Sequence, residues 1–560
     1  MKKIISYILI LVFPFIFFAC EDYYNVEPNN YVLEEQSFEK ETDALNLVYG
    51  VYSLLQPLVD QIWLIGEAQG DLVVAGPGAN RWITEFTQNR VTPYNPYTDY
   101  TNFYKVIIAA HKAMEGLAHI RRNDPVNYVQ SRYETNLAEL IYVRAWVYLT
   151  LVKIWDRVPY IDYSVTSIEQ IHNEAPVDGK IILENILEDI IKYEPQISTL
   201  EYLAPNSDLD IVRSRTMFTK PAAAFLKSEI YLYLDEIEKA YQAIRTYLPG
   251  GYIDQNVNKG VTPWTERAII DNIYHGYNNG ICVKQWVFFI EFDASRGQTN
   301  NLQRWTDNIN GGIYAVKPST YGIQYWKNTP LMLLEYQRPY FPDIPYIYGN
   351  SYSYFSTDEN GKPIKGYPED IHRGEGVSFW YSEGDTIIFK YLLRQQWIRR
   401  SIANGNANSN NDARFLIYRS TNYYLNVVEM VNNMGGTTFL ALTMLNGAMD
   451  QFESTRFSSR AMPFEFDPNS GMTEKEQVDK FILEEMALQY GYEGLRWFDL
   501  VRFSKRPGYE TWLADRVAQK YPPEQQEAIR LRLTDSRYWH LPYYNDNVIK
   551  NPNLIQKSGY

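Results

Sequence analysis

The chain has 560 residues, with 53 basic and 67 acidic side chains and a formal net charge of −14. This acidic balance argues against a nucleic-acid-binding protein, because such a protein presents a basic face to phosphate. Hydrophobic residues make up 45% of the chain and charged residues 21%, which is typical of a folded protein and excludes a disordered one.

Residues 1–19 have the pattern of a secretory signal: two lysines come first, and an apolar run follows over residues 4–18. The run is short for a membrane-spanning helix of about 20 residues, and no later stretch is apolar over that length. Cys20 follows directly, as in a bacterial lipobox, and is the predicted lipidation site; the alternative is a free cysteine near an ordinary cleavage site. Residues 20–36 lack helical periodicity and are predicted to form a tether.

Apolar residues then recur at intervals of three and four, the spacing of amphipathic helices. Ser37 is a candidate N-cap for the first of these helices. The spacing predicts helices over residues 38–58, 100–121, 134–155, 180–198, 218–233, 236–248, 419–433 and 474–490. Adjacent amphipathic helices with short joins indicate degenerate tetratricopeptide-like pairs, each of which buries its apolar face only by stacking on neighbours.

Residues 250–415 differ from the rest, because they contain most of the Gly, Asn and Pro clusters and six tryptophans. Trp286 to Phe292 is predicted to form a short strand. We therefore expect one mostly α domain over residues 37–560. A helical scaffold, about 37–250 and 415–505, would carry a loop-rich irregular lobe with minor strands, about 250–415.

Four segments resemble motifs of the SusD/RagB family of nutrient-binding outer-membrane lipoproteins. Residues 136–162 resemble its A-E-x-x-F-x-R-A-x-x-Y-x-x-L helix, which ends in W/F-G-D-V-P, with Arg157 as a departure. The other three are FTKPAAAFLKSEIYLY at 218–233, EEMALQYGYEGLRWFDLVRF at 484–503 and the tail NPNLIQKSGY at 551–560. Their order spans nearly the whole mature chain, and the lipobox agrees.

Charged residues in these motifs are interpreted as structural. Glu493, Arg496, Asp499 and Arg502 are expected to form an ion-pair and backbone-capping network at a tight turn around Gly494. Arg144 is expected to pair with Glu139 on the same helix.

Enzyme signatures are missing from the sequence. It contains no P-loop, no G-x-S-x-G elbow and no spaced His or Cys set for zinc, so no cofactor and no metal are expected. Paired carboxylates for glycoside hydrolysis depend on tertiary geometry, so a surface glycoside hydrolase stays open as an alternative.

A sugar-binding site needs exposed aromatic rings beside amide and charged side chains. The 48 tyrosines suit such amphipathic surfaces. Two stretches combine these residue types, Trp63 to Trp82 and His372 to Asp385. We expect the ligand contacts among Glu67, Asp71, Asn80, Arg81, Trp82, Arg373, Trp380 and Tyr381.

The resemblance implies the rest of the interpretation. SusD-like proteins bind ligands on loops after the first helix and in the irregular lobe, where both stretches fall. It implies an outer-membrane, cell-surface lipoprotein that binds oligosaccharide and delivers it to a SusC-like TonB-dependent transporter. It implies no enzymatic activity. Peptide binding, as in RagB-like proteins, is the alternative hypothesis.

Overall fold

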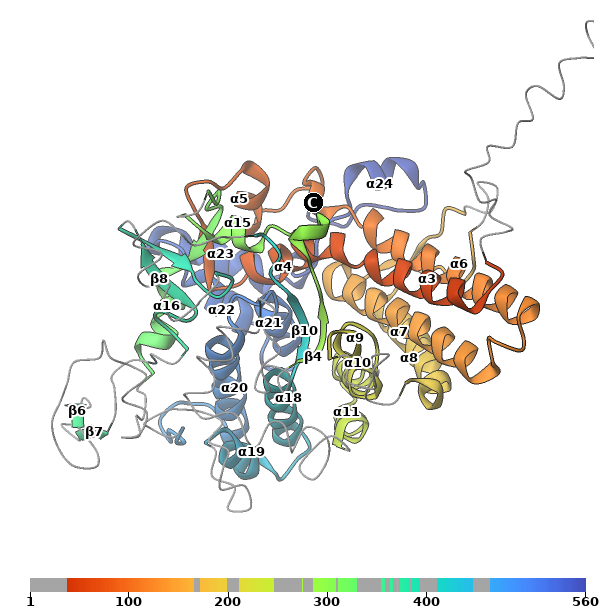
Figure 1. Ribbon diagram of the computed structural model, residues 1–560. Coiled ribbons are helices and arrows are strands. Elements are labelled where there is room, and N and C mark those ends of the chain that lie inside the picture. The colour runs from red at the N-terminus through yellow and green to blue at the C-terminus, as the bar shows by residue number, and fades with distance from the viewer. Residues whose placement is uncertain are drawn as a thin grey trace, which may run out of the picture.

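The computed structural model describes residues 38–165, 172–198, 211–245, 274, 286–308, 311–329, 354–357, 363–365, 370, 373–382, 384–392, 410–446 and 464–560. The protein is mostly helical with short strands, as predicted (Figure 1). The predicted signal, Cys20 and the tether lie outside these residues, as do Ser37 and Cys282. Within the described residues, no helix is both long and apolar enough to cross a membrane.

The four helices predicted in the first 200 residues are confirmed and pack against one another (Figure 1). They are α3 (Glu41–Ser53), α6 (Thr101–Asn123), α7 (Gln130–Trp155) and α8 (Gly179–Tyr193). Helix α3 begins after Lys40, whose backbone N–H donates to the Asp43 carboxylate at 2.9 Å. Helix α7 is buried on nearly every side from Asn136 onward, because α3, α6 and α8 pack around it.

The expected pairing of Arg144 with Glu139 is wrong. The Arg144 guanidinium pairs instead with Asp189 of α8 and contacts His111 of α6 at 3.1 Å. Residues five apart on a helix point about 140° away from each other, whereas neighbours three or four apart share a face.

The next helical pair is also confirmed. Helix α10 (Lys220–Tyr233) turns within three residues into α11 (Ile237–Ile244), and the Ser228 hydroxyl donates to the Ala240 carbonyl across the pair at 2.9 Å. Such short joins between packed helices are the arrangement expected of tetratricopeptide-like units.

The C-terminal third adds helices that sequence periodicity did not separate. The predicted helices are α18 (Ser420–Asn433) and α20 (Glu474–Tyr490); the Thr473 hydroxyl and the Glu476 carboxylate cap the start of α20 reciprocally. The others in this part are α19 (Thr438–Leu445), α21 (Arg496–Ser504), α22 (Trp512–Ala518), α23 (Pro523–Thr534) and α24 (Asn545–Lys550).

The described strands form five antiparallel pairs. They are β1 (Val73–Ala75) with β5 (Val316–Pro318), β2 (Val158–Pro159) with β3 (Pro176–Val177), β4 (Trp286–Ile290) with β10 (Phe415–Arg419), β6 (Tyr354–Thr357) with β7 (Pro363–Lys365), and β8 (Phe379–Ser382) with β9 (Asp385–Ile388). The predicted strand at Trp286 is confirmed as β4. A two-stranded ladder is marginal by itself, so these pairs depend on packing against the helices.

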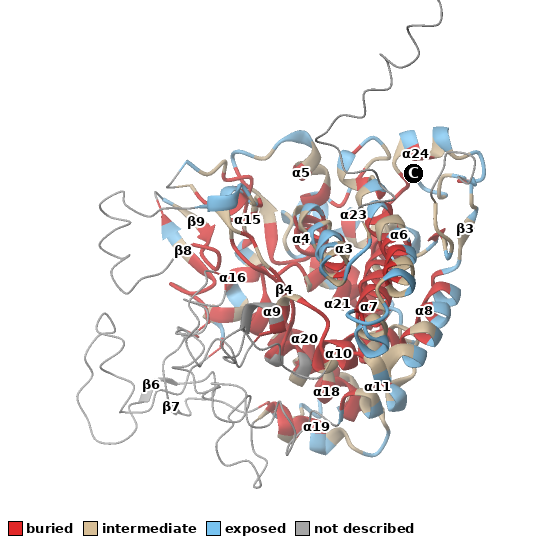
Figure 2. Cartoon of the chain, turned by 45° about the vertical axis from the view of Figure 1, so that its right-hand side comes forward, coloured by how far each residue is buried: buried red, intermediate tan, exposed pale blue. Residues whose placement is uncertain are grey.

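Short helices connect these elements: α4 (Val59–Ala68), α5 (Arg81–Thr87), α9 (Ile211–Thr216), α15 (Leu302–Thr306) and α16 (Thr320–Lys327). One continuous core runs from α3 to the C-terminal tail, visible as the red interior in Figure 2. Trp63 of α4 lies in this core and donates its indole N–H to the Tyr391 hydroxyl and the Tyr492 carbonyl, both at 2.9 Å. The core therefore joins segments from both ends of the chain.

Candidate functional site

The first predicted stretch places an aromatic ring at the surface. Asn80 caps α5 by accepting from the Ile83 backbone N–H at 3.0 Å, which fixes the helix start. Trp82 is half-buried, and the Arg81 guanidinium lies 4.5 Å from the centre of its ring. The Arg81 side chain is 69% exposed. Planar hydrogen-bond donors thus stack beside an apolar ring on an accessible surface.

Glu85 holds the next loop against α5. Its carboxylate accepts from the Thr92 backbone N–H at 3.1 Å, the Thr92 hydroxyl at 2.9 Å and the Asn95 side chain at 3.1 Å. This loop presents Tyr94, whose exposure of 61% is high for an aromatic residue. Sequence analysis missed Tyr94; its position between Pro93 and Asn95, where a turn is expected, was the available signal.

The glycines of this stretch serve close packing. The Gly78 backbone N–H donates to the Tyr314 carbonyl at 3.0 Å, and that of Gly76 donates to the Ala315 carbonyl at 2.9 Å. A Cβ at Gly78 would lie 1.5 Å from the Ile313 carbonyl oxygen. Gly78 is therefore required because two backbone segments meet there.

Replacing Gly78 with alanine is expected to lower the free energy of unfolding by about 1–3 kcal/mol, because the loop must separate from Ile313. Urea denaturation would measure the loss. Gly50→Ala in α3 is the matched control, since a Cβ there meets no atom within 4 Å. Alanine is the better helix former, so this control should be neutral or stabilising. Equal stability in both variants would contradict the close approach.

The second predicted stretch separates its two aromatic residues. Trp380 and Tyr381 are neighbours in β8, so their side chains point to opposite faces. Trp380 packs 6.0 Å from the Phe389 ring, beside the small cluster that contains Tyr314. Tyr381 is 45% exposed and lies 5.4 Å from the Lys327 ammonium group. The two rings therefore lie on opposite faces of β8 and cannot form one shared platform for a ligand.

The segment around Tyr314 connects the loop before α5 to the strand pair that carries Trp380. Tyr314 accepts from Gly78, and its hydroxyl donates to the Thr386 carbonyl in β9 at 2.7 Å. Because β9 pairs with β8, Tyr314 and β9 link the loop before α5 to the strand that contains Trp380. His372 and Glu383 of the second stretch lie outside the described residues.

Glu67, Asp71 and Arg373 are not placed as ligand contacts, because all three side chains are enclosed. Glu67 and Asp71 are 0% exposed and Arg373 is 1% exposed. Arg373 pairs with Asp370 at 2.5 Å and also with Glu485. Part of the stretch expected to be a loop is helix α4, which buries Glu67. We therefore expect Arg373→Ala to affect stability more than binding.

The pKa values of the two buried acids, Glu67 and Asp71, shift in opposite directions. Burial raises the pKa of Glu67 to about 7, although its carboxylate accepts from the Tyr492 and Gly494 backbone N–H groups at 2.9 Å. Burial by itself would also raise the pKa of Asp71, but the charge and hydrogen bonds of Arg496 outweigh it and hold that pKa below its usual range. The ionised Asp71 thus stabilises the contact with Arg496 at the start of α21, whereas burial disfavours the ionised form of Glu67.

The predicted network around Gly494 is confirmed only in part: Arg502 pairs with Asp499, but the other partners come from distant segments. Gly494 has a φ of 83°, a backbone conformation that favours glycine. Arg496 binds Asp71 through two hydrogen bonds of 2.7 and 2.8 Å. Glu493 pairs with Lys390 at 2.6 Å and Arg419 at 2.9 Å. Arg502 pairs with Glu429 and, at 2.8 Å, with Asp499.

Of the predicted site, Asn80, Arg81 and Trp82 thus form an accessible surface, to which the structure adds Tyr94, while Tyr381 is exposed separately on β8. Among the described residues, no group of three or more His, Cys, Asp or Glu side chains is arranged to hold a metal ion. An exposed ring with adjacent donors can bind the apolar face and the hydroxyls of a sugar.

Comparisons with known proteins agree with this architecture. The sequence model of the SusD family matches residues 290–560. SusD-like protein P38 of Formosa agariphila is 23% identical over 514 residues, which cover 90% of this chain and 92% of that protein. A solved SusD superfamily protein of Bacteroides thetaiotaomicron is 17% identical, with a TM-score of 0.65 over 93% of this chain and 99% of its own. A solved laminarin-binding SusD-like protein is 14% identical, with a TM-score of 0.61 over 93% and 100%.

Proposed function

We propose that this chain, which is similar to the SusD family over residues 290–560 and to SusD-like protein P38 over most of its length, is a cell-surface lipoprotein that binds oligosaccharide on the surface around Trp82. The observation that carries the binding role is the half-buried Trp82 ring with Arg81 stacked 4.5 Å from its centre. The relative that binds laminarin supports a glycan as the ligand class. The bound glycan would pass to a SusC-like TonB-dependent transporter in the outer membrane.

Calorimetry with the full mature chain tests the ligand class. Matched panels of neutral oligosaccharides and of short peptides should give binding for a glycan and none for the peptides. Peptide binding alone would favour the RagB-like alternative. An exposed tyrosine and an arginine also suit peptides, so the two panels, and not the fold, decide between them.

A glycoside hydrolase fits this surface less well. Glycosidases use two accessible carboxyl groups about 5–9 Å apart. Glu67 and Asp71 are enclosed, and the Glu85 side chain is 12% exposed and already accepts hydrogen bonds from Thr92 and Asn95. We expect incubation with a bound oligosaccharide to release no new reducing ends.

Cys20→Ala is expected to abolish membrane association, because acylation at this residue would supply the chains that anchor the protein. The variant should be found in the soluble fraction or as unprocessed precursor. Cell fractionation and surface labelling would measure this. Outer-membrane recovery equal to that of the unmodified sequence would contradict the lipoprotein assignment.

A further inference from the structure

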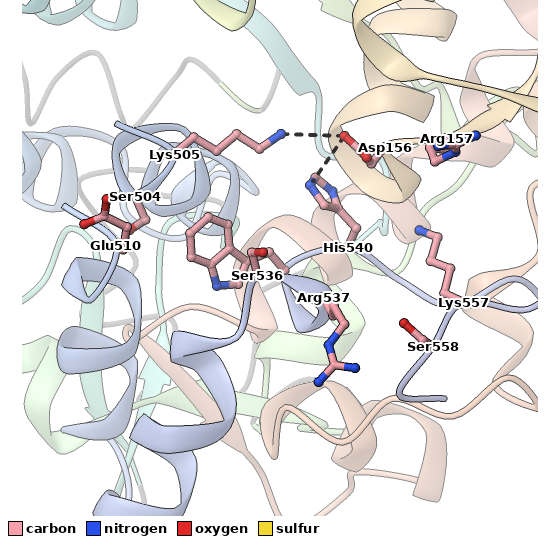
Figure 3. Close-up of a pocket in the computed structure, with 11 residues that line it drawn as sticks. Asp156, Arg157, Ser504, Lys505, Glu510, Ser536, Arg537, His540, Lys557 and Ser558 are labelled. Carbon is pink, nitrogen blue, oxygen red and sulfur yellow. Dashed lines mark ion pairs between the residues drawn. The ribbon is translucent and has the colours of Figure 1, made fainter. Parts of the chain in front are cut away.

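A second surface feature lies apart from Trp82. A cavity of about 630 Å³ opens where α7 and α21 end and where the C-terminal tail passes (Figure 3). Its volume falls within the range of sites that hold small ligands. The cavity is lined by Asp156, Arg157, Ser504, Lys505, Glu510, Ser536, Arg537, Trp539, His540, Lys557 and Ser558.

Cationic side chains outnumber carboxylates in this lining. Four are lysine or arginine, namely Arg157, Lys505, Arg537 and Lys557, whereas only Asp156 and Glu510 are acidic. The chain as a whole has a net charge of −14, so this local balance is opposite in sign to that of the molecule. Such a concave cationic surface concentrates anions.

Arg157 and Lys505 keep binding capacity, whereas Arg537 does not. Arg537 is occupied by Asp535 at 2.5 Å, and its guanidinium points away from Asp156 in Figure 3. In contrast, Arg157 is exposed and its guanidinium has no hydrogen-bond or ion-pair partner among the described residues. The Lys505 ammonium lies 3.7 Å from the Asp156 carboxylate, beyond direct hydrogen-bond distance, and its side chain is 40% exposed.

Lys557 and His540 form the inner wall. When protonated, the Lys557 ammonium donates to the Trp155 carbonyl and, at 2.8 Å, to the Leu541 carbonyl, which leaves one of its three protons for another acceptor. Burial lowers the pKa of Lys557 to about 7, and a bound anion would favour the protonated form. The His540 side chain is 11% exposed, and its Nδ1 has no hydrogen-bond partner among the described residues. Burial and the adjacent Lys505 and Lys557 lower the pKa of His540 well below its usual value.

The backbone at the cavity wall is strained. Asp156 has a φ of 62° and a ψ of −57°, and the Arg157 backbone N–H donates to the Trp155 carbonyl at 2.7 Å. This is the rare γ-turn with a positive φ at its central residue. Strain of this kind is found preferentially at ligand sites. Asp156 stands where the W/F-G-D-V-P motif has glycine. Its carboxylate points toward Lys505 and His540 (Figure 3).

We propose that this cavity binds the sulfate or carboxylate group of an acidic sugar, with Lys505, Lys557 and Arg157 as the cationic contacts. A bare ion would leave most of the 630 Å³ empty. A nucleotide base lacks a stacking platform, because Trp539 is 5% exposed and its indole N–H is bound to the Leu533 carbonyl at 2.7 Å. The identification of the ligand as a sugar rests on the proposed function. The inference that the cavity binds an oxyanion is independent of that function.

Calorimetry of the full mature chain with galacturonate, galactose 6-sulfate, galactose and inorganic sulfate would test the site. The acidic sugars should bind and galactose should not. Arg157→Gln combined with Lys505→Gln should weaken acidic-sugar binding about tenfold or more, since a hydrogen bond to a charged group contributes at least that much. Lys505→Arg, which keeps the charge, should retain binding. Lys180→Gln on α8, with a side chain 71% exposed, is the control and should change nothing.

The His540 ring protons give an independent readout, because a bound oxyanion stabilises the imidazolium and should shift their titration to higher pH. Equal binding of galactose and galacturonate would overturn the proposal, as would unchanged affinity in the double variant. Binding of inorganic sulfate alone, or only of vesicles with phosphate headgroups, would also overturn it. Failure of the Trp82 surface to bind glycan would leave these outcomes unaffected, because the two sites share no residue.

Discussion

Replacing Arg496 with alanine should lower the free energy of unfolding by about 3–5 kcal/mol, because one partner of a buried ion pair is lost. The Arg496 side chain is 2% exposed and that of Asp71 is 0% exposed. The guanidinium also donates to the Leu483 carbonyl at 2.7 Å. Truncation leaves the Asp71 carboxylate without its neutralising charge, and leaves that carbonyl with one donor fewer.

The pH dependence of this loss identifies its cause. Because Arg496 holds the pKa of Asp71 below its usual value, the pair stabilises the protein above the unfolded pKa of about 4, and the gain is lost as the pH falls through the folded pKa. In Arg496→Ala only the Tyr325 hydrogen bond and the charge of Arg516 still oppose burial, so the pKa of Asp71 should rise above its value in the unchanged protein. The deficit should therefore be largest at neutral pH and shrink on acidification, which urea denaturation across pH would show.

Two comparisons complete the Arg496 experiment. Asp71→Asn combined with Arg496→Ala should cost less than the sum of the single variants, because the pair acts as a unit. Arg530→Ala removes an exposed pairing with Glu527 and should leave stability unchanged within error. A variant of unchanged stability that no longer bound glycan would move Arg496 from the scaffold to the ligand site.

Trp82→Ala should weaken oligosaccharide affinity about thirtyfold or more, since truncating a central aromatic anchor typically costs about 2 kcal/mol. The ring supplies the apolar platform, and Arg81, stacked 4.5 Å from its centre, supplies donors for hydroxyl groups. Tyr94→Ala tests whether the loop held by Glu85 extends the same platform. Calorimetry against the oligosaccharide panel measures both variants.

Phe439→Ala is the matched control for Trp82, because Phe439 lies on α19 with an exposure of 75%. Its loss removes a comparable exposed ring and should leave affinity unchanged. Unchanged affinity in both Trp82→Ala and Tyr94→Ala, with the fold intact by circular dichroism, would place the glycan elsewhere. The similarity to the SusD family would stand, because it extends over residues 290–560 and does not depend on Trp82.

Local patterns in the sequence determined most of the helical scaffold. Helices such as α6 and α20 place apolar residues at intervals of three and four, and each turned out within a few residues of its predicted range. Helix α4 was not predicted, because residues on all its sides are buried and it therefore has no polar face. Exposure of the loop before α5 also followed from local composition, since its Pro, Gly and Asn residues favour a turn.

Only the tertiary structure decided which charged residues face a ligand and which support the fold. Asp71 and Arg496 are 425 residues apart in the chain and bonded in space, and no local pattern predicts that pairing. Local patterns also did not predict that Trp380 and Tyr381 differ in exposure. Nor did they predict that Asp156, Lys505 and Lys557 line one cavity. The physical reason is that helix periodicity depends on neighbours a few residues away, whereas desolvation and ion pairing depend on which distant segments pack together.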